Sequence, residues 1–144
     1  MKKIEEIEKE IINEFSFFED WTDKYQYIIE LGQKLNDFPK EKMTDDYKIK
    51  GCMSSLWVVS ELKDGRIYFT ADSDSSIVKG LVSLLIRVLS GQTPEDIINA
   101  KLEFIDKIGL RKHLAQTRAN GLASMIKQIK MDALAYKMKE KAEI

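Results

Sequence analysis

The stretch LWVVSELKDGRIYFT, residues 56–70, decides the fold class, because it predicts a β-hairpin. Asp64 and Gly65 form a two-residue turn signal of the type I′ kind, with alternating side chains before and after it. Pairing Lys63 with Arg66 sets the register of the two strands and gathers the larger apolar side chains on one, core-facing side. Those side chains are Leu56, Val58, Leu62, Ile67 and Phe69.

Helices are predicted before and after the hairpin. Isoleucines recur on one face of residues 4–11, and a second apolar stripe predicts a helix over residues 20–35. An almost wholly apolar helix is expected over residues 75–89, with N-cap oxygens supplied by residues 72–74. A last helix carries an apolar stripe between residues 122 and 133.

The order of these elements indicates the fold class. A third strand is expected near residues 47–49 or in the run that leads to Leu56. Because strands do not alternate with helices, a parallel nucleotide-binding sheet has no support. We therefore expect an α+β fold, a small antiparallel sheet of about three strands with helices packed on one face. The length of 144 residues suits one domain over residues 1–144.

Composition excludes several classes of function. Charged residues make up 33% of the chain and nearly cancel, leaving a net charge of −1 with no basic block, which argues against nucleic-acid binding. The longest apolar run, residues 77–89, contains Lys79 and Arg87 and is too short to span a membrane. The charged start lacks the apolar core of a signal peptide, so a cytoplasmic protein is expected.

Cys52 is the one cysteine, and it follows Gly51 just before the hairpin. A single thiol excludes an intramolecular disulfide, and together with the single histidine, His113, it is too little for a structural zinc site or an iron–sulfur cluster held by this chain. No metal site is expected. A reactive thiol and a buried packing residue remain equally open interpretations. A Cys52–His113 catalytic pair is possible in principle, but a surface or partly buried position at a helix end is favoured for His113.

Thiol chemistry without a second cysteine favours sulfur transfer. A thiolate attacks a disulfide or persulfide sulfur by the same displacement step, and a relay needs only one thiol on each partner. Lys48 and Lys50 would favour the thiolate if their side chains approach it. Counting back from Leu56 by twos, Cys52 shares the parity of the core-facing side, which predicts an inward thiol if the strand geometry persists.

Several motifs in a fixed order resemble the SufE family of sulfur acceptors over residues 21–130. They are YIIELG at residues 27–32, GCMS at residues 51–54 with Trp57, DSD at residues 72–74 with IVKGL at residues 77–81, TPEDI at residues 93–97, and Arg118 with Gly121 and Leu122. The resemblance implies a SufE/IscU-like fold and a role as a partner of cysteine desulfurases in iron–sulfur cluster assembly.

The resemblance implies that Cys52 takes persulfide sulfur from a SufS-like desulfurase, stimulates that enzyme, and passes the sulfur to a SufBCD-like scaffold. The protein is then a carrier whose only bound species is a transient persulfide, without a resident cofactor. A non-transferring module that docks on a desulfurase is the alternative. The sequence is compatible with a homodimer and leaves the oligomeric state open.

Support for the cysteine loop is expected from Gly51, Met53, Ser54, Asp74 and Arg118. Helix capping is the first interpretation of Asp74, and holding the loop is the second. Arg118 is expected near the loop, and pairing with a nearby acid is an equally open interpretation. Met53 departs from the glutamine that is frequent at this place in the family, so any contact made by that glutamine is in doubt.

Overall fold

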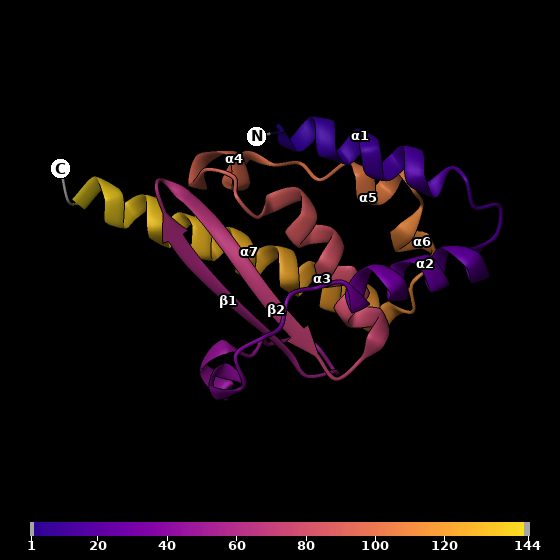
Figure 1. The fold of residues 1–144 in the computed structure, drawn as a ribbon, viewed down its shortest axis with the longest axis horizontal. Helices are drawn as coiled ribbons and strands as arrows, with labels where there is room; N and C mark the ends of the chain where they lie inside the picture. The colour runs from indigo at the N-terminus through magenta and orange to yellow at the C-terminus, as the bar shows by residue number, and fades with distance from the viewer. Residues whose placement is uncertain (1, 143–144) are drawn as a thin grey trace.

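The computed structural model describes residues 2–142 and contains the predicted hairpin (Figure 1). Strand β1 (Leu56–Lys63) pairs antiparallel with β2 (Arg66–Ser73), and Lys63 lies opposite Arg66 as predicted. The turn residues Asp64 and Gly65 have φ values of 52° and 77°, the left-handed geometry of a type I′ turn. The predicted core-facing side chains are buried, except for a half-buried Leu62.

The sheet has two strands within the described residues, and the expected third strand is reduced to one bridge between Lys48 and Trp57. The 3-10 turn η2 (Asp45–Tyr47) precedes this bridge, and Gly51 (φ 88°) turns the chain away soon after it. Too few extended residues lie between them to form a strand. The α+β class with a small antiparallel sheet is nevertheless confirmed.

The buried face of the hairpin packs against α3 (Ser76–Leu89), the most buried helix of the protein. Helix α2 (Trp21–Gln33) crosses α3 very closely, because a Cβ on Gly32 would lie 2.7 Å from the backbone nitrogen of Gly80. Two glycines at the crossing therefore let the two backbones meet. Helix α1 (Ile4–Phe15) also packs against α3 (Figure 1).

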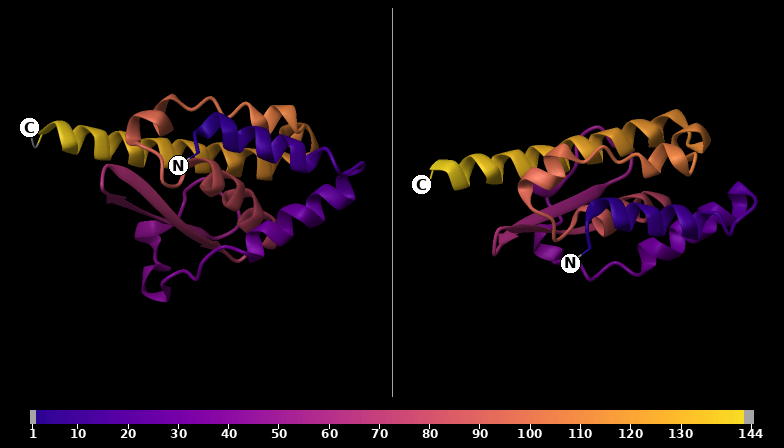
Figure 2. Two further views of the ribbon diagram at one scale, coloured as in Figure 1. Left: turned by 45° about the horizontal axis from the view of Figure 1, so that its top comes forward. Right: turned by 90° about the horizontal axis from the view of Figure 1, so that it is seen from above.

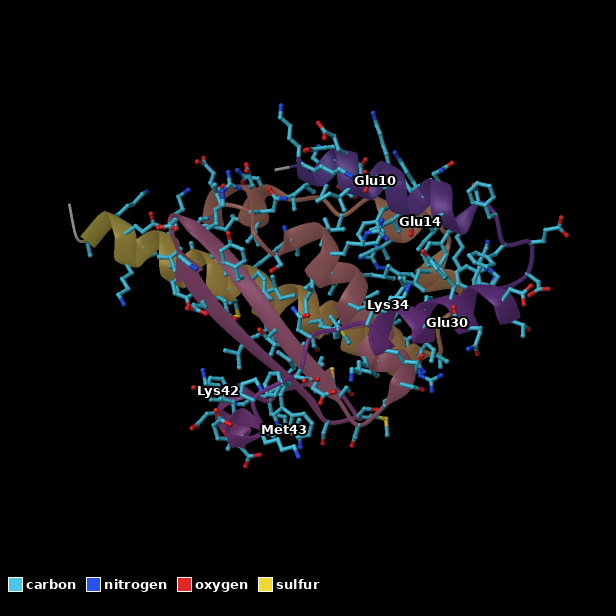
Figure 3. The ribbon with its side chains drawn as sticks, viewed as in Figure 1. Glu10, Glu14, Glu30, Lys34, Lys42 and Met43 are labelled. Carbon is cyan, nitrogen blue, oxygen red and sulfur yellow. The ribbon has the colours of Figure 1, made fainter. Side chains whose placement is uncertain are left out.

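A half-buried ion pair between Glu14 and Arg87 links α1 to α3. Arg87 donates to both carboxylate oxygens of Glu14, at 2.7 and 2.5 Å, and the Tyr27 hydroxyl donates to the same carboxylate. The Arg87 hydrogen bond is the largest cause that lowers the pKa of Glu14, while burial and the Glu14 carboxylate raise the pKa of Tyr27 to about 12. Figure 3 shows Glu14 on the side of α1 that faces the helices.

After α3 the chain continues through three short helices, α4 (Pro94–Asn99), α5 (Phe104–Lys107) and α6 (Leu110–His113). A further 3-10 turn, η1 (Lys40–Lys42), lies earlier in the chain, between α2 and η2. The long helix α7 (Gln116–Ala142) follows, packs against α4 and α3, and extends past the hairpin turn (Figure 2). Lys130 of α7 donates to the Ile98 and Ala100 carbonyls at the end of α4.

Candidate functional site

The cysteine loop, residues 50–55, lies between the bridging residue Lys48 and the start of β1, and it packs against α7. Gly51 has φ 88°, a backbone conformation that side chains rarely adopt, and a Cβ at this position would lie 2.4 Å from Ser124 Oγ of α7. Glycine is therefore required here both by backbone conformation and by space. As a consequence, the next residue, Cys52, lies against the surface of α7.

The thiol of Cys52 is half-buried against the first turns of α7. Its Sγ donates to the Gly121 carbonyl at 3.6 Å, and a Cβ on Gly121 would lie 3.3 Å from Sγ. Burial raises the pKa of the Cys52 thiol, because a thiolate loses more hydration than a thiol does on leaving water. In this conformation the thiol is stored in its protonated form, and its inward direction agrees with the parity of the core-facing side.

Asp74 anchors the other end of the loop. Its carboxylate accepts from the Ser55 N–H at 3.0 Å, and its own N–H donates to the Ser55 carbonyl at 3.2 Å. The Ser73 hydroxyl donates to the same carbonyl at 2.6 Å. The first interpretation of Asp74 as a helix cap is wrong: Ser75 caps α3 by accepting from the Val78 N–H. The helix begins one residue later than capping by Asp74 requires, which leaves this carboxylate free to hold the loop.

A pocket of about 320 Å³ opens beside the thiol. Of the residues expected to support the loop, Met53, Ser54 and Arg118 line this pocket, while Gly51 and Asp74 hold the loop from outside it. Met53 is 85% exposed, so it forms an apolar rim beside the sulfur. The lining consists of Cys52, Met53, Ser54, Val78, Ala115, Thr117, Arg118, Gly121 and Met125.

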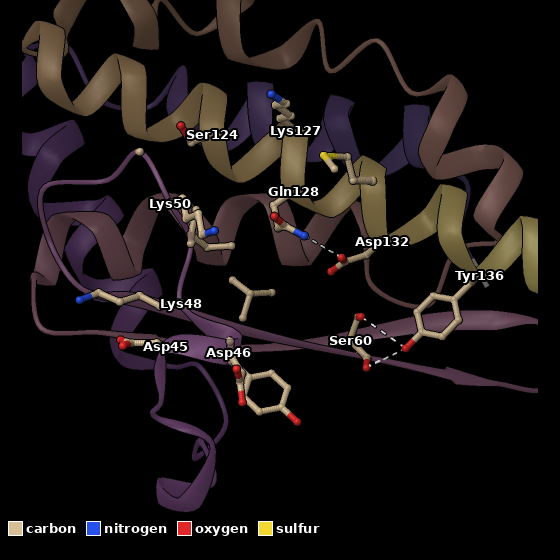
Figure 4. A pocket seen from close by; sticks show the side chains of 15 residues that line it. Asp45, Asp46, Lys48, Lys50, Ser60, Ser124, Lys127, Gln128, Asp132 and Tyr136 are labelled. Atoms are coloured by element: carbon tan, nitrogen blue, oxygen red, sulfur yellow. Dashed lines mark hydrogen bonds between the residues drawn. The ribbon is translucent and has the colours of Figure 1, made fainter.

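Arg118 provides the positive charge of this pocket. It lies in the first turn of α7, is exposed, and makes no ion pair within residues 2–142, so the alternative that it pairs with a nearby acid is not observed. Lys48 and Lys50 line a second cleft on the far side of Gly51 (Figure 4). They do not counteract the burial that raises the thiol pKa.

Two pocket residues, Met125 and Ala115, were not singled out from the sequence, and Val78 appeared only within a family motif. Val78 and Met125 are ordinary apolar residues of their helices, and only the tertiary fold turns them toward the thiol. Gly121 appeared only as part of a family motif. Its position inside a helix is itself a signal, since a helical glycine costs about 0.5–1 kcal/mol relative to alanine and therefore suggests a close approach.

His113 takes no part in this site. Its ring stacks on Trp21 with 4.2 Å between ring centroids, and its Nδ1 lies 2.9 Å from the Gly109 carbonyl. It is exposed and does not line the Cys52 pocket, which leaves no support for a Cys52–His113 catalytic pair. Among residues 2–142, no three His, Cys, Asp or Glu side chains are grouped to hold a metal ion.

The class of protein that the structure shows is an α+β fold with its one cysteine on an anchored loop beside a small pocket. A family model described as "SufE: Fe-S metabolism associated domain" matches residues 9–133, and the chain belongs to this SufE family. Over the part of the chain that the structure describes, no helix has the length and apolar character needed to cross a membrane.

Curated relatives support the assignment. The chain is 40% identical over 129 residues to an uncharacterised SufE-like protein of Rhizobium meliloti, covering 86% of this chain and 92% of that protein. It is 34% identical over 128 residues to an uncharacterised SufE-like protein of Synechocystis, covering 89% of this chain and 80% of the relative.

A solved structure supports the fold alone. It is the solution structure of a hypothetical protein from Thermus thermophilus, with a TM-score of 0.73 and 18% sequence identity. The match covers 90% of this chain and 94% of that one.

Proposed function

We propose that this protein accepts persulfide sulfur from a SufS-like cysteine desulfurase onto Cys52, stimulates that desulfurase, and hands the sulfur to a SufBCD-like iron–sulfur scaffold. The observation that carries the proposal is the placement of the one cysteine. It lies on a loop anchored at both ends, with its sulfur at a pocket that contains Arg118, which makes no ion pair with any other residue of the described range 2–142. Membership of the SufE family supports the link to iron–sulfur metabolism.

The transfer step balances without an oxidant. The Cys52 thiolate attacks the outer sulfur of the desulfurase persulfide, and a new S–S bond forms as the old one breaks. The electron pair of the broken bond leaves on the desulfurase sulfur, which takes up a proton. Transfer to the scaffold repeats the same displacement, with a scaffold thiolate as the attacking group.

The proposed step requires two states of the loop, of which the structure contains the first. In the stored state the thiol donates to the Gly121 carbonyl, and burial raises its pKa, so little thiolate forms. Attack requires the sulfur to leave that contact, where hydration and the Arg118 guanidinium favour the thiolate. After transfer, the apolar side chains of Val78 and Met125 can shield the terminal sulfur from water and from other thiols.

The direct test is the intact mass of the protein after incubation with a cysteine desulfurase from the same organism and free cysteine. We expect the native chain to gain one sulfur, to lose it on treatment with a reductant, and to accelerate the desulfurase. The matched control is Cys52→Ser, which should gain no sulfur while melting at the native temperature.

A native chain that gains no sulfur from a desulfurase that it binds would refute the carrier. That result would favour the alternative function, a docking module in which Cys52 is a packing residue. Two observations favour this alternative: the thiol is half-buried, and burial raises its pKa.

A further inference from the structure

The two edges of the hairpin are treated differently by the rest of the chain. The outer edge of β2 is covered: the Ile67 N–H donates to the Gln92 carbonyl, the Gly91 N–H donates to the Ile67 carbonyl, and the Phe69 N–H donates to Ser90 Oγ. The outer edge of β1 is covered only at its start, by the Lys48–Trp57 bridge. The later part of β1 is therefore an edge strand.

The register shows which backbone groups of β1 point outward. Lys63 and Arg66 flank a two-residue turn and so exchange hydrogen bonds with each other, and alternate residues of β1 then face away from β2. Ser60 and Leu62 are two of these outward residues. Within residues 2–142 no hydrogen bond is made by the outward N–H of either, and the Ser60 carbonyl accepts only from the Tyr136 hydroxyl of α7, at 3.0 Å.

Ser60 of this edge lines a large cleft of about 1050 Å³, whereas Leu62 lies outside the lining of that cleft (Figure 4). The cleft lies between β1 and α7 and extends from Gly51, next to Cys52, to Ser60 and Tyr136. Ser124 approaches Gly51 and Tyr136 approaches Ser60, so twelve helical residues separate its two ends. At ~1.5 Å per residue the cleft is about 18 Å long, the length of roughly five or six extended residues.

We propose that an extended segment of the protein partner that meets Cys52 lies along this cleft, continues past its end at Tyr136, and pairs with Ser60 and Leu62 as a third strand. The inference deepens the proposed function and rests on it, since the partner is the desulfurase. Addition of a strand to an open edge is a recurring mode of peptide recognition, in which main-chain hydrogen bonds supply affinity.

The charge at the far end of the cleft indicates one side chain of the segment. Asp132 points into the cleft beside Gln128, which donates to it at 2.8 Å (Figure 4). Burial raises the pKa of the Asp132 carboxyl more than its hydrogen bonds with Gln128 and Ser60 lower it, so a basic residue at this position would stabilise the carboxylate further. The partner segment should therefore carry Lys or Arg opposite Asp132, about five or six residues from the part that reaches Cys52.

A second copy of this chain fits the cleft less well. The open part of β1 in another copy is itself flanked by α7, where Tyr136 binds Ser60, so it cannot enter a groove bounded by the same helix. A free extended segment brings no second helix with it, and to pair with Ser60 it has only to displace the Tyr136 hydroxyl from the Ser60 carbonyl.

The test is residue-resolved amide hydrogen exchange of the Cys52→Ser protein, with and without the desulfurase, because this variant keeps the cleft and has no thiol to take sulfur. We expect exchange at Ser60 and Leu62 to slow by at least about tenfold in the complex. Glu61 is the internal control, since its N–H already bonds to Tyr68 in the hairpin and its exchange should change little.

Protection confined to residues 51–55 would overturn the strand inference and leave the proposed function standing. No protection anywhere in the presence of the desulfurase would overturn both. Protection of Ser60 and Leu62 without the desulfurase, rising with protein concentration, would assign the cleft to a second copy of this chain and overturn the choice of partner.

Two substitutions at one position test the same bond by affinity. Ser60→Pro removes the outward N–H and no ladder bond to β2, which is the place where an edge strand tolerates proline. We expect it to weaken desulfurase binding about tenfold, while Ser60→Ala, which keeps the N–H, binds as the native chain does. Equal binding by both folded variants would refute strand addition. If Ser60→Pro fails to fold, the exchange measurement still decides.

Discussion

Gly121→Ala tests whether the thiol is stored against α7. The new Cβ would lie 3.3 Å from Cys52 Sγ, inside the ~3.5–4.0 Å at which heavy atoms pack best, so the sulfur must move outward by roughly 0.5 Å. Because the thiol would also leave its bond to the Gly121 carbonyl, we expect more thiolate at a given pH and several-fold faster alkylation.

Stability alone would not reveal this change. Alanine inside a helix gains about 0.5–1 kcal/mol over glycine, whereas loss of a hydrogen bond costs about 0.5–1.5 kcal/mol. The two effects oppose each other, so the free energy of unfolding should change by less than about 1 kcal/mol. A double-mutant cycle with Cys52→Ser isolates the contact, because Gly121→Ala should stabilise the serine variant more than the native chain.

The assay is the rate of iodoacetamide alkylation as a function of pH, followed by intact mass. Burial raises the pKa of Cys52, so the native midpoint should lie above that of an exposed thiol, and Gly121→Ala should lower it. Asn120→Ala is the matched control, because it improves helix propensity one residue away from the contact. If Gly121→Ala leaves both the rate and the midpoint at their native values, the thiol is not held where the structure places it.

Three further predictions concern the loop anchor, the helix crossing and the ion pair. Asp74→Ala removes a loop anchor, so it should speed thiol alkylation several-fold and shift the melting temperature only slightly; an unchanged rate would mean that the loop opens independently of this carboxylate. Gly32→Ala places a Cβ 2.7 Å from backbone of α3, so urea unfolding should show a loss of about 1–3 kcal/mol, whereas Gln33→Ala on the exposed side should cost little. The Arg87 hydrogen bond lowers the pKa of Glu14, so its stabilisation is present above the unfolded value of about 4.3 and is lost as pH falls through the folded pKa; Glu14→Gln should flatten the acid limb of the stability–pH curve, and a parallel, unflattened curve would contradict the assignment.

The hairpin was predictable in detail because its determinants are local. A two-residue turn with Gly65 fixes the register, and alternation then fixes which side chains are buried. The start of α4 was equally local, since Thr93 accepts from the Asp96 N–H as its cap and Pro94 occupies the first helical position. The third strand was over-predicted, because apolar content near residues 47–49 carries no information about the turns that end the extended run.

The candidate site was predictable in part. Cys52 stood out because it is the one thiol, and the inward parity counted from Leu56 agrees with its half-burial. Asp74 was first assigned to a cap because several oxygens precede α3, and sequence cannot show which of them the helix uses. Ser75 takes that place, and the carboxylate of Asp74 reaches across to Ser55 instead.

The sequence by itself determined the kind of chemistry open to this protein and the local elements that frame it. One cysteine limits any thiol chemistry of this chain to a single thiol. Turn residues, caps and apolar periodicity specify the hairpin and the helices through neighbours a few residues apart. Only the tertiary structure decided the state of the thiol and the free edge of β1. Gly121 lies 69 residues from Cys52, and Tyr136 lies 76 residues from Ser60. Contacts of such separation arise from the packing of whole helices, and no local pattern encodes them.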